Sequence, residues 1–361
     1  MNRLVAAFAL AVLAVTAGPS APAGAAEDPL KVGFVYVGPI GDHGWTYQHD
    51  QGRKALEAEF GDKVETAYVE NVSEGADAER VIRELAASGN DLIFTTSFGF
   101  MNPTVKVARQ FPDKTFEHAT GYKRADNVAT YAARFYEGRA VIGTIAGRMT
   151  KSNVIGYIGA VPIPEVVRGI NAFTIALRKV NPDATVRVVW VNSWYDPGKE
   201  AEAAKVLIDQ GADILVQHTD STAPLQAAEK AGIYGFGQAS DMAAFAPKAQ
   251  LTAIVDDWSG YYIDRARAVM DGTWESTDTW GGLASGMVKL APYNEEAMPA
   301  DVVAEARAVE EAIKSGERDP FAGPVRDQSG TVRIAEGETA SDKELLGMNW
   351  YVEGVEGKLP N

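Results

Sequence analysis

Short apolar runs alternate with amphipathic segments along most of this chain. Residues 32–37, 64–69 and 91–96 are apolar runs of strand length, and residues 44–60, 76–88 and 103–110 have the periodicity of helices. In the segment 76–88, Val81, Ile82 and Leu85 fall on one helical face. Strands that alternate with helices of this length predict βαβ units, and therefore an α/β fold built on a parallel sheet.

The alternation continues through a second series of elements. Residues 115–118 and 128–131 extend the first sheet, and 136–149 is expected to be a helix rich in small residues. The second series has expected strands at 154–158, 186–191, 213–217 and 233–236, and expected helices at 166–179, 199–210 and 223–231. Each helix is expected to pack one apolar stripe on its sheet.

The second series repeats the first. Residues 31–35 are echoed by 153–158, and residues 89–94 are echoed by 211–216. The matching glycines differ by 156 − 33 = 123 and by 211 − 89 = 122 positions. Two matches in the same order at nearly the same spacing predict two copies of one α/β unit, with a ligand cleft between two lobes. A chance similarity between strand–helix units is the alternative.

The last third has a different pattern. Residues 251–255 and 287–290 are expected strands, and 259–270 and 299–314 are expected helices. The tail from Gly316 is expected to hold one hairpin, around residues 331–334, and an apolar stretch at 345–351 that docks on the body. No linker is rich enough in Pro, Gly or Ser for freely swinging domains, which favours several short crossings between the lobes.

Composition and charge limit the kinds of molecule that this protein is expected to bind. The chain has 361 residues, 46% of them hydrophobic, and a formal net charge of −15. A chain of this length can bury one large core or two ordinary ones. An acidic surface repels nucleic acid and anionic lipid, so neither is an expected partner.

The N-terminus has the pattern of a signal peptide. Arg3 is followed by an uncharged apolar run over residues 4–17, and small residues suited to cleavage stand at 23–26. We therefore expect residues 1–26 to be removed and the protein to act in the periplasm; an uncleaved anchor is the alternative. The chain has no cysteine, so we expect neither a disulfide nor a lipid anchor on cysteine.

Candidate ligand contacts follow the strands, because ligands of open parallel sheets bind beyond the carboxyl ends of the strands. These loops combine aromatic rings with short polar groups, which suits a planar heteroaromatic ligand. A structural role is the alternative for each residue, such as a helix cap for Asp241 or a place in the core for Phe98 and Phe100. The candidates are Asp42, Trp45, Phe98, Phe100, Trp194, Asp220, Asp241 and Asp257.

Catalytic and metal sites find little support in the sequence. The histidines at 43, 49, 118 and 218 share no ligand spacing. The chain has no GxSxG elbow and no glycine-rich phosphate loop followed by Lys. We therefore expect neither an enzyme nor a metal or cofactor site.

At these loops the sequence resembles the basic membrane protein family of ABC transporter substrate-binding proteins, which includes purine nucleoside receptors. The resemblance spans roughly residues 30–300. In the first loop Asp42 matches the family's Asp, and Trp45 stands at its Phe position. The stretches that carry the resemblance are residues 38–45 with Gly52, 97–100, 156–182, 193–196 and 237–241.

This resemblance implies a type I periplasmic binding fold, with two Rossmann-like lobes joined by three crossings that close over the ligand. The expected lobes are residues 27–150 with about 257–280, and residues 151–256 with about 281–361. The resemblance also implies a purine base held between Trp45 and Trp194, with Asp42 reading its edge. An ABC permease in the inner membrane is the implied partner, and we expect a monomer.

Two departures from the family pattern bear on the ligand. Nucleoside-binding members grip the ribose with an Asp and a Lys, where this chain has Ala239 and the pair Asp256–Asp257. An unpartnered ribose hydroxyl would cost about 1–3 kcal/mol. The hypothesis is therefore a free base such as adenine. The alternatives are a nucleoside or another small heterocycle, and a role in a sensor system instead of an importer.

Overall fold

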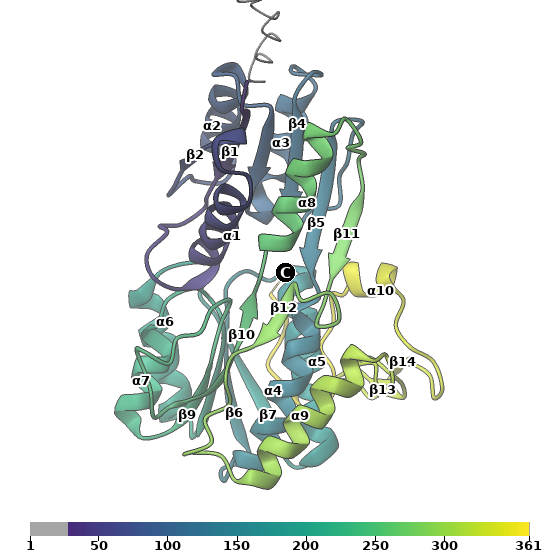
Figure 1. Ribbon diagram of the computed structural model, residues 1–361. Coiled ribbons are helices and arrows are strands. Elements are labelled where there is room, and N and C mark those ends of the chain that lie inside the picture. Colours follow the sequence, from purple (N-terminus) through teal and green to yellow (C-terminus); the bar gives the residue numbers. More distant parts are fainter. Residues whose placement is uncertain (1–27, 361) are drawn as a thin grey trace, which may run out of the picture.

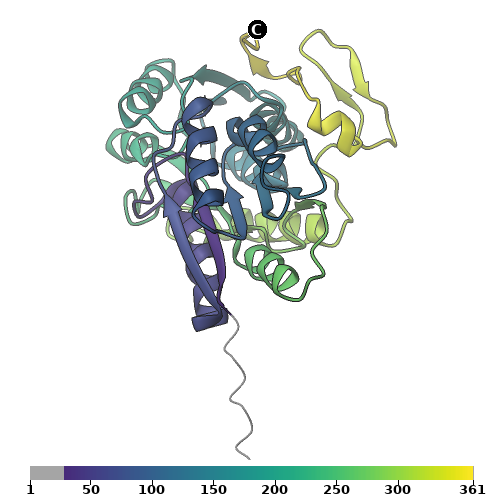
Figure 2. The same cartoon turned by 90° about the horizontal axis from the view of Figure 1, so that it is seen from above.

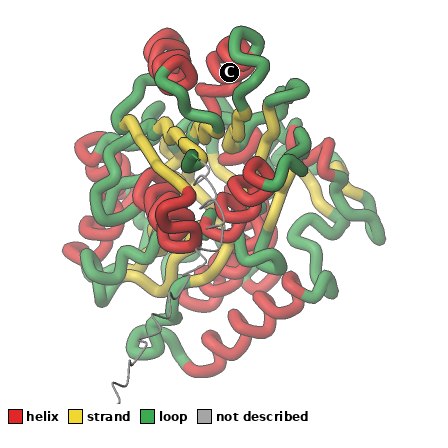
Figure 3. The backbone as a smooth tube through the Cα atoms, turned by 45° about the horizontal axis from the view of Figure 1, so that its top comes forward, coloured by secondary structure: helices red, strands yellow, loops and turns green. Residues whose placement is uncertain are grey.

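The computed structural model describes residues 28–360, and the expected signal peptide over 1–26 lies outside them. The described chain forms two α/β lobes, one above the other in Figure 1. Helices lie on both sides of the strands (Figure 3). No helix within residues 28–360 has the length and apolar character needed to cross a bilayer.

The first lobe is built on a six-stranded sheet with the order β11-β5-β4-β3-β1-β2. Every neighbouring pair in this sheet is parallel. Its strands are β1 (Leu30–Val35), β2 (Val64–Val69), β3 (Leu92–Thr95), β4 (Thr115–Ala119), β5 (Val128–Ala133) and β11 (Asp278–Gly281). Its helices are α1 (Gly44–Phe60), α2 (Ala76–Ala87), α3 (Met101–Ala108) and α8 (Ser259–Met270), with short 3₁₀ turns at Gly61–Lys63 and Phe98–Phe100.

The second lobe is built on a seven-stranded sheet with the order β12-β10-β9-β8-β6-β7-β15, in which only β12 runs antiparallel to its neighbour. Its strands are β6 (Val154–Gly159), β7 (Thr185–Trp190), β8 (Ile214–His218), β9 (Tyr234–Gly237), β10 (Gln250–Asp256), β12 (Val288–Leu290) and β15 (Val355–Glu356). Its helices are α4 (Phe135–Met149), α5 (Pro164–Val180), α6 (Pro197–Asp209), α7 (Ala223–Ala231) and α9 (Ala300–Lys314).

Alternate residues of the central strands enter different cores, as the period of a strand requires. In β1, Phe34 belongs to a large cluster that extends through α4 into the second lobe, whereas Val35 belongs to a separate cluster under α2 and α3. In β8, Val216 joins the shared cluster and Leu215 a third one. The apolar runs of the sequence are therefore strands buried on both faces.

The chain crosses between the lobes three times, at Arg134 between β5 and α4, at residues 257–258 between β10 and α8, and at residues 282–287 between β11 and β12. These crossings, the parallel-dominated sheets and the cleft between them define the type I periplasmic binding fold. The crossings lie side by side, since the N–H of Arg134 donates to the carbonyl oxygen of Gly281 at 2.6 Å and that of Asp257 to Met287 at 3.0 Å. Adjacent crossings of this kind are suited to hinge closure of two rigid lobes.

Helix α4 falls inside the range 27–150 expected for the first lobe, but it packs mainly on α5 and α9 of the second. Its glycines account for this placement. A Cβ on Gly143 would lie 2.3 Å from the carbonyl oxygen of Phe173, and one on Gly147 would lie 2.8 Å from that of Leu177. The small residues of α4 therefore let it pack closely against the backbone of α5.

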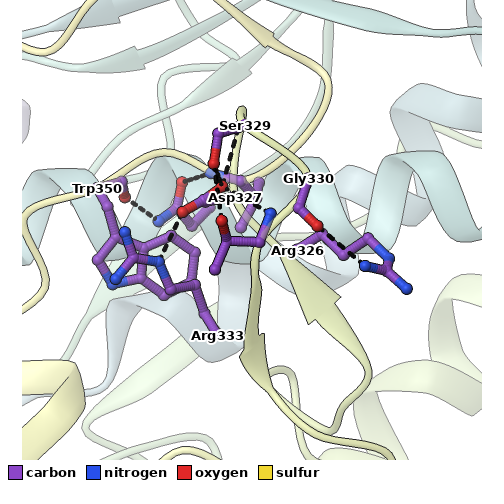
Figure 4. A network of polar contacts seen from close by, with 9 residues as sticks. Arg326, Asp327, Ser329, Gly330, Arg333 and Trp350 are labelled. Atoms are coloured by element: carbon purple, nitrogen blue, oxygen red, sulfur yellow. Dashed lines mark hydrogen bonds and ion pairs between the residues drawn. The ribbon is translucent and has the colours of Figure 1, made fainter.

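Beyond α9 a C-terminal extension follows the second lobe and projects to one side (Figure 2). It contains a hairpin of β13 (Val325–Arg326) and β14 (Val332–Ile334), the short helix α10 (Asp342–Leu346), and β15. Asp327 organises its turn by accepting hydrogen bonds from Ser329, Thr331 and Arg333 (Figure 4). These donors lower the pKa of Asp327 to about 2. The extension also reaches the first crossing, where Arg134 pairs with both carboxylate oxygens of Asp342 at 2.8 Å.

Candidate ligand-binding site

A narrow cleft lies between the lobes at the carboxyl ends of their strands. Clefts between domains are preferred sites for small ligands. The first lobe contributes mainly apolar and aromatic side chains to the walls, and the second lobe contributes mainly polar ones. The lining residues are Val37, Trp45, Ser97, Phe98 and Thr120 from the first lobe, and Glu165, Trp194, His218, Asp220 and Gln238 from the second.

Trp45 is held in place by its own lobe. Its Nε1 donates a 2.6 Å hydrogen bond to the carbonyl oxygen of Thr96, just beyond the end of β3. Its ring meets His49 edge-on at 4.3 Å and Trp258 at 5.5 Å. Burial lowers the pKa of His49 well below its usual value, so this ring packs as a neutral aromatic group. The arrangement presents Trp45 to the cleft as a fixed aromatic surface.

Trp194 enters the cleft from the second lobe, in the loop after β7. The loop is tied to the loop after β8 by a hydrogen bond from the backbone N–H of Asp220 to the carbonyl oxygen of Trp194. Phe98 of the first lobe lies on the 3₁₀ turn after β3 and lines the same cleft. Three aromatic side chains from the two lobes, Trp45, Phe98 and Trp194, therefore surround the space.

The ionisable groups of the cleft come from the second lobe. Burial and the nearby Glu200 raise the pKa of Asp220 to about 8, although a hydrogen bond from the Trp45 backbone opposes the shift. His218 lies 3.6 Å from a carboxylate oxygen of Glu165, and burial lowers its pKa. Near neutral pH this wall can thus offer both hydrogen-bond donors and acceptors.

A second layer of buried polar groups stands behind that wall. Arg139 of α4 is fully buried and donates a hydrogen bond to the side-chain oxygen of Gln238. Asp256 at the end of β10 is also fully buried, and neither of its carboxylate oxygens has a hydrogen-bond partner within residues 28–360. Burial, together with Glu165 and Asp220, raises the pKa of Asp256. Unpaired polar groups of this kind are costly and gather at functional sites.

The lobes are in direct contact beside the cleft. The backbone N–H of Gly44, at the start of α1, donates a 2.7 Å hydrogen bond to Ser240 Oγ of the second lobe. The rings of His43 and Phe245 meet edge-to-face across the same interface at 5.0 Å. Gly44 has φ +84°, and a Cβ there would lie 2.8 Å from the carbonyl oxygen of Asp220. The structure therefore represents a closed arrangement of the two lobes.

Of the eight residues selected from the sequence, the structure brings Trp45, Phe98, Trp194 and Asp220 together in the cleft. The other four have different surroundings. The Asp42 side chain is 75% exposed and contacts His43, and Phe100 is buried in the core under α2 and α3. Asp241 accepts a hydrogen bond from Gln250 Nε2 at 2.7 Å. Asp257 pairs with Lys289 at 2.5 Å and accepts the backbone N–H of Ser259 at the start of α8.

Several residues in the cleft wall and behind it were not selected from the sequence. His218 is the last residue of β8, and Gln238 directly follows β9. The expectation that ligands bind beyond strand ends therefore covers both positions, but it does not distinguish them from their neighbours. Glu165 starts α5 and Arg139 lies inside α4, where no local pattern separates a ligand contact from a helix surface. Within the described residues, no group of three or more His, Asp or Glu side chains is arranged to hold a metal ion.

Comparisons with known proteins agree with this architecture. Residues 30–319 match the family model described as ABC transporter substrate-binding protein PnrA-like. A purine-binding protein of Brucella abortus (strain 2308) is 62% identical over 335 residues, covering 93% of this chain and 95% of that protein. A Haloferax volcanii protein with the name of an ABC transporter glucose-binding protein is 39% identical, covering 92% and 82% of the two chains.

A solved structure shows the same fold. The ABC transporter solute-binding protein of Aeropyrum pernix K1 superposes with a TM-score of 0.71 at 19% identity, covering 82% of this chain and 94% of that one. The protein has the fold of periplasmic ligand receptors, and the chain belongs to the PnrA-like family of ABC transporter substrate-binding proteins. Members of this family are substrate-binding proteins that work with a permease, not enzymes.

Proposed function

We propose that this protein captures a purine base, adenine or a close analogue, in the cleft between its lobes and delivers it to an ABC permease. The observation that carries the proposal is the composition of the cleft, where Trp45, Phe98 and Trp194 surround a space walled on one side by Asp220 and Gln238. Aromatic faces stack on a flat base, and the polar groups pair with its edge. The purine-binding name of the relative with 62% identity supports the same ligand class.

Capture proceeds by closure. A ligand that contacts both Trp45 and Trp194 binds the closed form better than the open form, and so shifts the population toward closure. The hydrogen bond between Gly44 and Ser240 then forms across the interface. The closed form is the one expected to dock on the permease. The same capture step would serve a sensor system if the partner were a membrane receptor.

We favour a base over a nucleoside because the two positions with which nucleoside-binding members grip the ribose are altered in this chain. Ala239, at the position where nucleoside-binding members have an Asp, is fully buried and carries only a methyl group. Asp257 is engaged by Lys289 and Ser259. A ribose hydroxyl buried without a partner costs about 1–3 kcal/mol.

Titration calorimetry of the purified protein with adenine, adenosine and glucose tests the proposal. We expect adenine to bind more tightly than adenosine, and glucose not to bind. Clearly tighter adenosine binding would make the protein a nucleoside receptor. Binding of glucose without binding of adenine would match the ligand in the name of the Haloferax relative and would overturn the purine proposal.

We also propose that the protein acts in the periplasm as a monomer after loss of residues 1–26. This follows from the signal-like pattern of Arg3 and the apolar run over residues 4–17. Mass spectrometry of the protein isolated from the periplasmic fraction of its own cells tests the cleavage. An intact Met1 in a membrane fraction would contradict it. Light scattering of the same material measures the oligomeric state.

A further inference from the structure

One carboxylate links the two lobes beside the cleft. Glu74 lies in the first lobe, in the loop between β2 and α2. Its Oε1 accepts a hydrogen bond from Trp194 Nε1 of the second lobe at 3.3 Å. Trp194 lines the cleft, so this bond connects a loop of one lobe to an aromatic wall contributed by the other.

The same oxygen also holds the loop that carries Phe98. Oε1 of Glu74 accepts hydrogen bonds from Ser97 Oγ at 2.6 Å and from the backbone N–H of Gly99 at 3.0 Å. Gly99 leaves room for this contact, since a Cβ there would lie 2.2 Å from the carboxyl carbon of Glu74. Three donors from both lobes therefore converge on one atom, and the residues that they steady, Phe98 and Trp194, face the same cleft.

We propose that Glu74 is a positioning residue that holds the Phe98 loop within the first lobe and locks Trp194 into place when the lobes close. The proposal rests on the proposed function, because the ligand clamped by these rings is the purine base. In an open form the lobes separate, and Glu74 and Trp194 each regain water. The bond between them therefore favours the closed, ligand-bound form alone and acts mainly by slowing ligand release.

The variant Glu74→Ala tests this role in the full-length mature protein. We expect the Kd for adenine to rise roughly threefold to tenfold, as the net value of one hydrogen bond implies, mostly through faster dissociation. Glu74→Gln keeps an oxygen at the Oε1 position and should recover most of the loss. The matched control is Glu70→Ala, which removes a carboxylate whose hydrogen bond within residues 28–360 stays inside the first lobe, from the N–H of Ile40 at 2.8 Å. Its Kd should stay at the wild-type value.

A double-mutant cycle separates positioning from a general effect. Trp194→Phe keeps an aromatic ring but removes the Nε1 donor, so Glu74→Ala should cost less in that background than alone. Fully additive losses, or a Glu74→Ala variant that matches Glu70→Ala, would overturn the inference. Melting temperatures without ligand check that each variant is folded. If the wild type does not bind adenine, the proposed function fails; if it binds and Glu74→Ala has no effect, only this inference fails.

Discussion

The two walls of the cleft differ in how their side chains are held. In the first lobe, the ring of Trp45 packs against His49 and Trp258, and its indole nitrogen donates a hydrogen bond to the carbonyl oxygen of Thr96. The second lobe presents carboxylates, an imidazole and an amide. Behind them, Nε and Nη1 of Arg139 and both carboxylate oxygens of Asp256 are buried without hydrogen-bond partners within residues 28–360. Packing thus fixes one wall in advance, whereas the other keeps unused hydrogen-bonding capacity. The stacking surface is ready before binding, and the polar wall reads the ligand.

The largest effect should come from removing the fixed surface. Trp45→Ala is expected to weaken adenine binding by about 1–3 kcal/mol, the value of base–aromatic stacking. It should also lower the stability of the first lobe, because the ring packs on Trp258. Calorimetry with adenine and a thermal melt measure the two effects. The control is Trp350→Ala, since Trp350 lies under Arg333 in the C-terminal extension (Figure 4). Equal adenine affinity in the two variants would remove Trp45 from the site.

The next effect should come from the polar wall. Asp220→Ala is expected to cost about 1–3 kcal/mol of adenine binding, because the groups that it would pair with stay buried and unsatisfied. Asp42→Ala removes an exposed carboxylate and should change binding by less than about 0.5 kcal/mol. Calorimetry on both variants compares the walls directly. If Asp42→Ala lost more binding free energy than Asp220→Ala, the base edge would be recognised by the first lobe and not by the second.

A smaller effect should come from the contact between the walls. Gly44 and Gly41 both have positive φ, +84° and +53°, so an Ala at either position strains the backbone. The two positions differ in their surroundings. A Cβ added to Gly44 would lie 2.8 Å from the carbonyl oxygen of Asp220 in the other lobe, whereas a Cβ added to Gly41 would have no atom within 4 Å. We expect Gly44→Ala to weaken adenine binding by about 1 kcal/mol through hindered closure. The control Gly41→Ala should lower the melting temperature alone. Equal affinities would show that closure tolerates the added methyl.

The smallest effect is the pH dependence of stability. The pKa of Asp220 is raised to about 8 in the folded protein, so the folded form holds a proton that the unfolded chain has lost. The contribution of Asp220 to the free energy of unfolding is greatest below the pKa of an ordinary Asp, and it decreases as the pH rises toward 8. Between pH 6.5 and 8.5 the melting temperature of the ligand-free protein should therefore decline more steeply in the wild type than in Asp220→Asn. Parallel curves would mean that Asp220 is ionised throughout.

The sequence predicted most of the fold because buried strands and amphipathic helices have distinct periods. It missed β11 and β15, which are short edge strands with little apolar pattern. It grouped α4 with the first lobe because helix periodicity does not reveal which sheet a helix covers. Four of the selected residues line the cleft because strand ends are defined by topology. Topology does not define the direction in which each side chain points. For this reason Phe100 was selected although it lies in the core, and Asp257 although it lies at the start of a helix.

The three crossings also set the order in which the molecule can be completed. The first sheet needs β11, which ends at Gly281, and the second needs β15, which ends at Glu356. In a growing chain the first sheet therefore stays unfinished until Gly281 has been made, and the second until Glu356 has been made, so the first lobe can be completed before the second. The contiguous segment 154–256 cannot complete the second sheet by itself, because the edge strands β12 and β15 come from later parts of the chain.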